Sequence, residues 1–430
     1  MSMTITPELT TLAVNTIKML AVDGVEKAKS GHPGMPMGAA HYAFTLWARY
    51  LRHNPNDPTW PNRDRFVLSA GHGSMLLYAL LHLAGYDLPR EELERFRQFG
   101  SKTPGHPEYG HTAGVETTTG PLGQGLANGV GMAIAARMAA ARYNTPEHTI
   151  VDHYVYGIAG DGCLMEGVSS EAASLAGHLG LGNLIFFYDD NHITIEGATD
   201  LAFSEDRAKR FEAYGWQVLV VPDGEDLAAV DEALSAAQAD TERPSLLKIR
   251  TVIAHGSPNK AGTAASHGSP LGQDEIELTK EALGWPPELA FVVPAQVYAQ
   301  YSQRAAHGAE VRGEWQERVA AYHEAHPQEA AQWDEASAGR LPAGWREALP
   351  VFNAGDKLAT RAASGKVLNA LAPLVPTLLG GSADLAPSNN TYLTGEGDFQ
   401  RGERAGRNLR FGVREHAMGG ILNGLALHGG

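Results

Sequence analysis

The residues best suited to chemistry are the triplet Gly160-Asp161-Gly162 and, thirty positions after Asp161, Asn191. The triplet begins at the last residue of the apolar stretch YVYGIAG, and Asn191 directly follows NLIFFYDD. Both stretches have the composition of buried strands, and the helix pattern LMEGVSSEAASLAGHLGL separates them. Because a strand–helix–strand unit makes its two strands parallel, we expect Asp161 and Asn191 at the carboxyl edge of one sheet, where such sheets bind ligands.

A carboxylate and an amide oxygen at that edge favour a site for a hard cation. Mg²⁺ and Ca²⁺ take such oxygen ligands and complete their shells with phosphate oxygens and water. Gly162 would let the backbone approach a diphosphate, and the N–H groups of the following helix would face it. A GDG triplet alone is usually only a turn, but the spaced asparagine makes the combination much more specific.

The elements that position these residues alternate between helix and strand. Leu9, Leu12, Ala13, Thr16 and Leu20 form one face of an opening helix, and a second helix pattern, LANGVGMAIAARMAAARY, ends before Asn144. After the strand–helix–strand unit, the stretches WQVLVV, DLAAVDEALSAAQ and SLLKIR repeat the alternation. We therefore predict a doubly wound α/β domain with a parallel sheet over residues 1–320.

A second α/β domain is predicted at residues 356–430, after a polar helical linker at 321–355. Its elements are expected within KLATRAASGKVLNALAP (helix), PTLLGGSADL (strand), NLRFGV (strand) and REHAMGGILNGLALHGG (helix). One or two strands cannot bury both faces of a sheet, so we expect this domain to be incomplete.

The composition limits the possible partners. The formal net charge of −15 disfavours binding to nucleic acid or to an acidic membrane surface, so an anionic substrate needs a local group of positive side chains. The single cysteine, Cys163, is interpreted as structural and fits a reducing compartment. Since the sequence has neither a run of about 18 apolar residues nor a signal-peptide pattern, we expect a cytoplasmic protein.

GDGCLMEG followed by FFYDDN resembles the thiamine-diphosphate signature, and the neighbouring motifs resemble those of transketolases. The matching segments, in family order, are KSGHPGMPMG, SAGHGSMLLYALLHLAGY, KTPGHPE, AGVETTTGPLGQG, GSPNKAG, SHGSPLG, GGSADLAPSN and FGVREHAMGGILNGLALHGG. They span essentially the whole chain. The resemblance implies a thiamine-diphosphate-binding fold with a diphosphate-binding and then a pyrimidine-binding domain. It also implies two-carbon ketol transfer between sugar phosphates in the pentose phosphate pathway, with Mg²⁺ or Ca²⁺, by a homodimer with active sites at the subunit interface.

The resemblance also implies a role for individual residues. The metal would be bound by Asp161, Asn191 and the main-chain oxygen of Ile193. The cofactor would be bound by His72, Gly120, Leu122, Gly162, Asn191, His267, Asp384 and Glu415. His32, His106 and His267 would surround the reacting end of the sugar, while Arg361 and Ser388 would hold its phosphate. Glu415, supplied by the partner subunit, would act on the pyrimidine ring, and with the three histidines it forms the implied catalytic set.

Each assignment has a simpler alternative. Any one of the histidines alone could be an ordinary loop residue, and GPLGQG could be only a helix-starting turn. Glu166 and Glu171 are expected in a carboxylate network across the dimer, but Glu171 could equally be a solvated helix-face residue. Ser388 could be a turn residue within PSNN.

Two departures from the family pattern are visible. Ala264 stands where close relatives tend to carry a second histidine, although His267 is retained. The chain also ends at Gly430, inside the second domain, so we expect a fragment or an interrupted reading frame whose activity alone is open.

Other functions remain as alternatives. They are dihydroxyacetone synthase, deoxyxylulose-phosphate synthase and a non-catalytic module that holds the cofactor without turnover. A nicotinamide dehydrogenase is disfavoured, because GPLGQG follows no convincing strand and lacks a spaced acidic partner.

Overall fold

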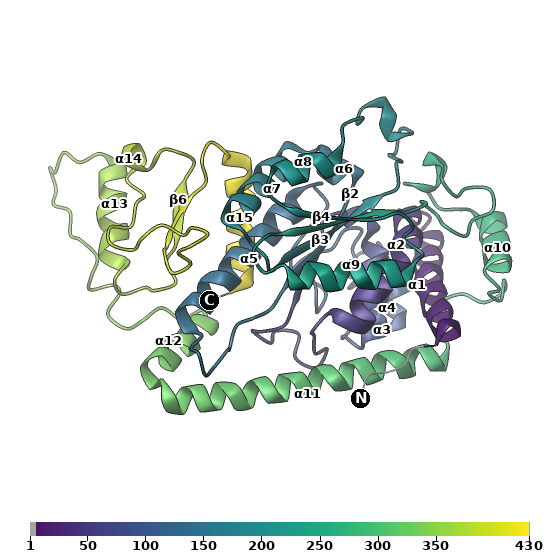
Figure 1. Ribbon diagram of the computed structural model, residues 1–430, viewed down its shortest axis with the longest axis horizontal. Coiled ribbons are helices and arrows are strands. Elements are labelled where there is room, and N and C mark those ends of the chain that lie inside the picture. Colours follow the sequence, from purple (N-terminus) through teal and green to yellow (C-terminus); the bar gives the residue numbers. More distant parts are fainter. Residues whose placement is uncertain (1–5, 430) are drawn as a thin grey trace.

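The computed structural model describes residues 6–429 and contains a five-stranded parallel sheet in the order β1-β2-β3-β5-β4 (Figure 1). Its strands are β1 (Arg65–Leu68), β2 (Val155–Gly160), β3 (Leu184–Asp190), β4 (Gln217–Val221) and β5 (Ser245–Arg250). The predicted parallel α/β sheet is confirmed. The sequence patterns located every strand except β1, whose four residues are too few to show a periodicity.

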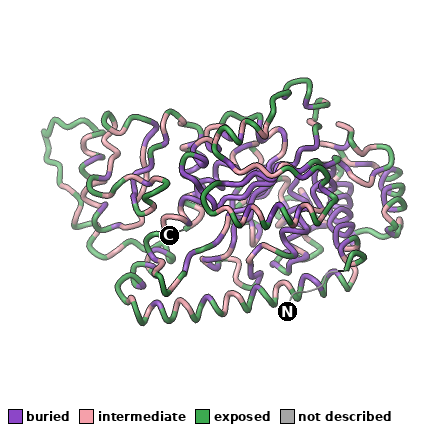
Figure 2. The backbone as a smooth tube through the Cα atoms, in the orientation of Figure 1, coloured by how far each residue is buried: buried purple, intermediate pink, exposed green. Residues whose placement is uncertain are grey.

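Helices cover both faces of this sheet. Phe187 of β3 stacks on Tyr42 of α2 (Gly34–Thr45), with ring centroids 5.4 Å apart. The preceding Phe186 faces Gly129 of α5 (Gln124–Tyr143), where a Cβ would lie 3.0 Å from the phenyl ring. Because successive strand residues point to opposite sides, α2 and α5 lie on opposite faces, as the doubly wound prediction requires. The buried core runs along the sheet between them (Figure 2).

Further helices of this part are α1 (Pro7–Ala28), α3 (Ser74–Ala84), α4 (Arg90–Leu93), α6 (Asp161–Met165), α7 (Gly167–Leu179), α8 (Arg207–Ala213), α9 (Leu227–Ala239) and α10 (Gln273–Ala282). In α1, Pro7 occupies the first turn and the Thr6 hydroxyl accepts the N–H of Leu9. The prediction of a single apolar face holds only for the first turns, since from Ala13 onward even Lys18 is buried. A helix packed on several sides needs no amphipathic stripe.

The predicted helix LMEGVSSEAASLAGHLGL is wrong in its outline. Two helices occupy this region, because Glu166 has an extended backbone (φ −66°, ψ 133°) that separates α6 from α7. α6 starts at Asp161 itself, so the GDG triplet forms the first turn of a helix rather than a loop before one. The break lets α7 pack beside α5 while α6 stays at the end of β2.

A long helix leads out of the first part of the chain. α11 (Ala295–Ala325) runs along one side of the molecule, and α12 (Pro327–Ser337) follows it (Figure 1). Trp315 of α11 packs edge-on against Trp60, and its indole N–H donates to the carbonyl of Ile150. Helical character was expected here, but α11 passes through position 320, so that domain boundary stays a prediction. None of the helices within residues 6–429 is both long and apolar enough to cross a membrane.

The C-terminal part contains the four predicted elements in order, α13 (Thr360–Leu371), β6 (Gly380–Ser382), β7 (Asn408–Arg410) and α15 (Glu415–His428). The stretch between the two strands also holds a short helix that was not predicted, α14 (Ala386–Asn389). β6 and β7 form a two-stranded parallel sheet, and both are shorter than the predicted stretches. The last residue of the predicted final helix, Gly430, lies outside the described residues.

α15 packs against the first part of the chain rather than against its own small sheet (Figure 1). Two glycines allow a close crossing with α5. A Cβ on Gly424 would lie 1.9 Å from the carbonyl oxygen of Asn128, and one on Gly131 would lie 2.1 Å from that of Ile421. Since backbone atoms cannot move aside as a side chain can, these two positions require glycine. The crossing fixes α15 on α5.

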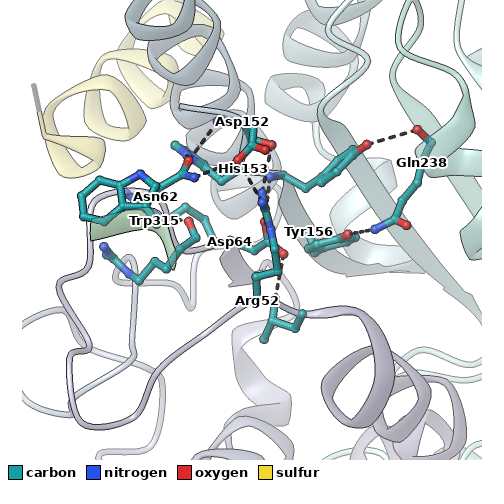
Figure 3. Close-up of polar contacts among 12 residues, drawn as sticks. Arg52, Asn62, Asp64, Asp152, His153, Tyr156, Gln238 and Trp315 are labelled. Carbon is teal, nitrogen blue, oxygen red and sulfur yellow. Dashed lines mark hydrogen bonds and ion pairs between the residues drawn. The ribbon is translucent and has the colours of Figure 1, made fainter. Parts of the chain in front are cut away.

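A polar cluster holds the amino-terminal edge of the sheet (Figure 3). The buried carboxylate of Asp64 accepts the backbone N–H groups of Arg52 (2.8 Å) and Tyr154 (2.9 Å). The Arg52 guanidinium reaches both Asp64 and Asp152, and Asn62 exchanges two hydrogen bonds with Asp152. The cluster therefore ties the segments that lead into β1 and β2, and it lies at the edge opposite to the GDG triplet.

Candidate active site

A cleft of about 370 Å³ lies at the carboxyl ends of β1, β2 and β3. Ten residues selected from the sequence line it: His32, His72, His106, Gly120, Leu122, Asp161, Gly162, Asn191, Ile193 and His267. Its wall also includes Met35, Ala70, Cys163, Met165, Asp189 and Thr194, which sequence reasoning did not assign to a site. Residues spread over more than two hundred positions thus meet at one place.

Asp161 lies where β2 ends, beside the end of β3. Gly160 pairs with Asp189 in the parallel register, so the residues that follow the two strands are neighbours. The Asp161 carboxylate is 3% exposed and accepts the hydroxyl of Tyr188 (2.5 Å) and the backbone N–H of His192 (3.2 Å). Burial raises the pKa of Asp161 to about 6, and the nearby charges of Asp190 and Asp189 add to the rise. A bound cation would favour the ionised carboxylate.

Asn191 presents its amide oxygen in a fixed direction. Its Nδ2 donates to the Asp189 carboxylate at 2.8 Å, and its Oδ1 accepts the backbone N–H of Ile193 at 2.9 Å. Asp189 is itself held by the hydroxyl of Thr251, at 2.6 Å. Between Asn191 and Ile193, His192 has a left-handed backbone (φ 62°), which turns the chain back toward Asp161. The carboxylate and amide oxygens are the donor types that Mg²⁺ and Ca²⁺ prefer.

The neighbouring Asp190 stabilises this turn, and it was not among the residues selected from the sequence. Its buried carboxylate is paired with Lys248 at 2.7 Å and with Arg207 at 3.1 Å. Burial would raise the pKa of Asp190, but hydrogen bonds from Lys248 and Tyr188, together with the charge of Lys248, outweigh burial and lower the pKa. No sequence signal separates Asp190 from its neighbour Asp189, because the pairing depends on residues of β5 and α8.

Three histidines form a compact group in the cleft. The ring centroids of His32, His72 and His267 lie 5.1–5.9 Å apart, and the His72 and His267 rings are stacked. They come from three separate connections. His32 lies before α2, His72 lies after β1, and His267 follows the short turn Ala264–Ser266, in which Ala264 departs from the family pattern. Burial lowers the pKa of His32 to about 4, and it also lowers the pKa of His72 well below its usual range. These rings are therefore neutral at pH 7 and can both donate and accept.

Two glycines shape the wall of the cleft. Gly120 has φ 145°, and a Cβ there would lie 3.1 Å from the ring of His106. A Cβ on Gly162 would lie 2.8 Å from the side chain of Leu122. Larger residues at either position would push a cleft-lining side chain out of place. Burial also lowers the pKa of His106, with the charge of Arg97 as the next cause.

Four predicted site residues do not line this cleft within the chain. Arg361 on α13, Ser388 on α14 and Glu415 at the start of α15 are exposed. Asp384 lines a separate pocket of about 250 Å³ beside β6 and β7 and has a left-handed backbone (φ 63°). Their predicted roles therefore need a second surface that brings them to a cleft.

Glu171 has a defined contact instead of a purely solvated one. Its carboxylate accepts the backbone N–H of Ala417 at 2.9 Å, which caps the first turn of α15 from outside the helix. Glu166 lies exposed at the break between α6 and α7. The polar face of α7 thus contacts the helix whose first residue is Glu415.

Comparison with known proteins decides the family. Residues 9–342 match the thiamine diphosphate binding domain of transketolase, and residues 356–430 match the transketolase pyrimidine binding domain. The chain belongs to the transketolase family. It is 58% identical over 420 residues to the transketolase of Geobacillus stearothermophilus and 54% identical over 421 residues to transketolase 1 of Escherichia coli. Each alignment covers 97% of this chain and 63% of the relative, so the chain spans less than two thirds of these relatives.

Solved structures give the same result. The transketolase of Pichia stipitis in complex with sedoheptulose-7-phosphate matches with a TM-score of 0.96 at 49% identity, over 98% of this chain and 63% of that one. The transketolase of Leishmania mexicana matches with the same TM-score at 46% identity and the same coverage. The resemblance read from the motifs is confirmed for family and fold.

The cleft residues fit thiamine diphosphate, which the matched domain binds, together with a divalent metal. Asp161 and Asn191 offer oxygen ligands of the type that Mg²⁺ or Ca²⁺ needs. The Nδ1 atoms of His32 and His267 are buried and have no hydrogen-bond partner among residues 6–429. Buried polar atoms normally have a partner, so a polar ligand in the cleft would satisfy them.

Proposed function

We propose that this chain provides the cofactor-binding part of a transketolase. The reaction is reversible transfer of a two-carbon ketol unit from a ketose phosphate such as xylulose 5-phosphate to an aldose phosphate such as ribose 5-phosphate, in the pentose phosphate pathway. The supporting observation is the meeting of three neutral histidines with the Asp161–Asn191 oxygens in one cleft. The sugar phosphate bound to the related Pichia stipitis enzyme supports the substrate class.

The floor of the cleft would bind the metal and the diphosphate. Asp161, Asn191 and the main-chain oxygen of Ile193 are proposed as metal ligands. Gly162, His72 and His267 would contact the diphosphate, with Gly120 and Leu122 along the cofactor. When bound, thiamine diphosphate supplies the nucleophilic carbon that carries the two-carbon unit between the sugars.

The histidines would handle the sugar hydroxyl groups. His32, His106 and His267 have lowered pKa values because they are buried. A neutral imidazole can accept a hydroxyl proton at one nitrogen while it donates from the other. These side chains would therefore orient the sugar and move protons at its reacting end without adding charge.

A second subunit would complete the site. Arg361, Asp384, Ser388 and Glu415 do not line the cleft of their own chain. A homodimer could bring them to the cleft of the partner, where Arg361 and Ser388 would bind the substrate phosphate and Asp384 and Glu415 the cofactor. The planar guanidinium of Arg361 suits a phosphate and would supply local positive charge in an acidic protein. A cytoplasmic location is part of this proposal and rests on the single cysteine.

The test combines binding with turnover. Calorimetry with thiamine diphosphate should show binding that requires Mg²⁺ and is lost in Asp161→Ala. Asp231→Ala, a half-buried position of α9 that pairs with Arg49, is the matched control and should bind normally. Transfer from xylulose 5-phosphate to ribose 5-phosphate is then measured with the same three proteins. Absence of metal-dependent binding in the unmodified chain would contradict the proposal.

A non-catalytic cofactor-binding module is the second candidate, because four of the predicted residues lie away from the cleft. Binding without turnover would favour it. Should turnover occur, preference for formaldehyde over ribose 5-phosphate as acceptor would indicate a dihydroxyacetone synthase instead.

A further inference from the structure

A second group of ligand-type side chains lies away from the cleft. His41 is on α2, Glu225 is in the loop after β4, and His255 is in the loop after β5. One potential ligand atom from each lies within 4.8 Å of the other two. β4 and β5 are adjacent parallel strands, so both loops leave the same edge of the sheet. None of the three residues has a place in the proposed transketolase machinery.

The distances among these three side chains are close to those between the ligands of a metal site. His255 Nε2 lies 2.8 Å from Glu225 Oε1, and the His41 and His255 ring centroids are 5.6 Å apart with the planes tilted by 57°. Ligands on a tetrahedral Zn²⁺ with bonds of about 2.0 Å are separated by about 3.3 Å. Small side-chain rotations would therefore bring all three atoms onto one ion.

His41 has an unmet bonding requirement. Its Nδ1 is buried and has no hydrogen-bond partner within the described part of the chain. A buried nitrogen left unpaired costs about 1–3 kcal/mol. A metal ion bound through this Nδ1, between His41 and His255, would pair it.

Lys18 gives the competing explanation. The residue is buried, and its Nζ lies 2.8 Å from Nδ1 of His255. Without a metal, the Lys18 ammonium donates to Nδ1 and the Nε2–H of His255 donates to Glu225, which is a complete chain of hydrogen bonds. This chain leaves His41 unpaired, however. When a metal takes Nε2, the ring proton must be on Nδ1, and the Lys18 amine then becomes its acceptor.

The local charge is compatible with replacing this chain of hydrogen bonds by a bound metal ion. Asp223 and Glu225 face His255 from the loop after β4, and Lys18 faces it from α1. Two carboxylates and one ammonium leave a net charge of −1. With a divalent ion and a neutral amine the sum is zero, so the ion does not create an uncompensated charge.

We propose that His41, Glu225 and His255 bind a transition-metal ion such as Zn²⁺, at a site separate from the oxygen site at Asp161. Two imidazoles and one carboxylate favour Zn²⁺ or Co²⁺, whereas Mg²⁺ prefers an all-oxygen shell. The ion ties the loops after β4 and β5 to α2. Gly34, at the start of α2, accepts the N–H of Ala254 next to His255, and His32 precedes it in the cleft. The site therefore braces the segment that carries a cleft histidine.

The experiment uses the whole chain after treatment with a chelator, with excess Mg²⁺ present to occupy oxygen sites. Zn²⁺ binding is measured by calorimetry, and Co²⁺ is added as a spectroscopic probe. We expect one Zn²⁺ per chain and the visible absorption of tetrahedral Co²⁺. His41→Gln and Glu225→Gln should each weaken binding by more than about tenfold. Glu225 is exposed, so its variant remains informative if His41→Gln folds poorly.

Asp161→Ala is the matched control and should keep this Zn²⁺ site. Zn²⁺ binding that Glu225→Gln and His41→Gln leave unchanged would overturn the proposal. Binding lost only in Asp161→Ala, octahedral Co²⁺, or the absence of saturable Zn²⁺ binding would do the same, and would leave the Lys18–His255–Glu225 hydrogen bonds as the full account of the cluster.

Discussion

At the scale of single residues, the cleft depends on side chains whose orientation is fixed by hydrogen bonds to neighbouring residues. Asn191 can aim its oxygen because Asp189 takes its Nδ2, and Asp189 is in turn held by Thr251. Asp161 is oriented by Tyr188 and by the backbone of His192. The predicted ligands thus rest on partners that carry no recognisable motif of their own.

Asn191→Ala tests this arrangement. The change removes one oxygen ligand and one donor to the buried Asp189 carboxylate, which keeps the Thr251 hydroxyl. We expect Mg²⁺-dependent binding of thiamine diphosphate to weaken by about 10–100-fold or more. Calorimetric titration at fixed Mg²⁺ measures it, and the exposed Asn353→Ala serves as the control. Equal affinities in the two variants would exclude Asn191 from the metal site.

At the scale of elements, short contacts decide where helices and strands lie. The crossing of α5 and α15 depends on glycine, and the amino-terminal edge of the sheet depends on a buried carboxylate. Both features couple segments far apart in the sequence. Each feature can be tested with one substitution and a control substitution of the same residue type.

Gly424→Ala should destabilise the chain by about 1–3 kcal/mol, because the new methyl group meets the carbonyl oxygen of Asn128. Gly419 is on the same helix, and a Cβ there has nothing within 4 Å. Gly419→Ala should therefore be neutral or stabilising by up to about 1 kcal/mol. Urea unfolding of both variants measures the difference, and similar values would mean that the two helices do not cross this closely.

Asp64→Asn should lower the free energy of unfolding by about 2–4 kcal/mol, since the Arg52 guanidinium loses its buried partner. Asp231→Asn removes a more exposed partner of Arg49 and should cost less than about 1 kcal/mol. Thermal and urea unfolding compare them. A cost for Asp64→Asn no larger than for the control would show that Asp152 alone suffices for Arg52.

At the scale of the whole molecule, several histidines are buried in the neutral form. Burial lowers the pKa of His53 to about 3, with the charge of Arg304 as a further cause. The unfolded chain protonates the same ring near pH 6.5. The unfolded state therefore takes up protons first as the pH falls, and stability is lost from about pH 6.5 downward until the folded pKa is reached.

His53→Gln should reduce this acid sensitivity. The unmodified chain is expected to lose about 2 kcal/mol at pH 5 through His53 alone, relative to pH 7.5. The variant should lack that part of the slope, whereas the exposed His111→Gln should keep it. The free energy of unfolding in urea is measured at both pH values. Parallel slopes in all three proteins would contradict a buried neutral His53.

The sequence predicted the parts of the fold that have repeating patterns. β2 to β5 and α5 were located because each has a regular run of apolar residues. α2 and α3 were not identified, because residues buried on all sides leave no amphipathic period and GMPMG at the start of α2 reads as a loop. The break at Glu166 was missed although Gly167 directly follows it, because a single glycine inside a helical pattern does not by itself end a helix.

The site was predictable where motifs carry the chemistry. Ten of the selected residues meet in one cleft, most of them because they follow strand ends or precede helices, whereas His106 and His267 lie in longer connections. Asp190 and Lys248 were not found, since only the register of β3 and β5 makes them neighbours. In the proposed dimer, the placement of Arg361, Ser388, Asp384 and Glu415 depends on the partner subunit, which no spacing within one chain determines.

The close crossing of α5 and α15 has a consequence for mixtures of defective subunits. Since α15 is fixed on the first part of its own chain, Glu415 is presented outward whatever the state of that chain's cleft. In the proposed dimer, a subunit with Asp161→Ala still offers Glu415 to its neighbour. A neighbour with Glu415→Gln still has an intact Asp161. Two individually inactive variants, mixed and allowed to exchange partners, would regain one working site in each hybrid pair.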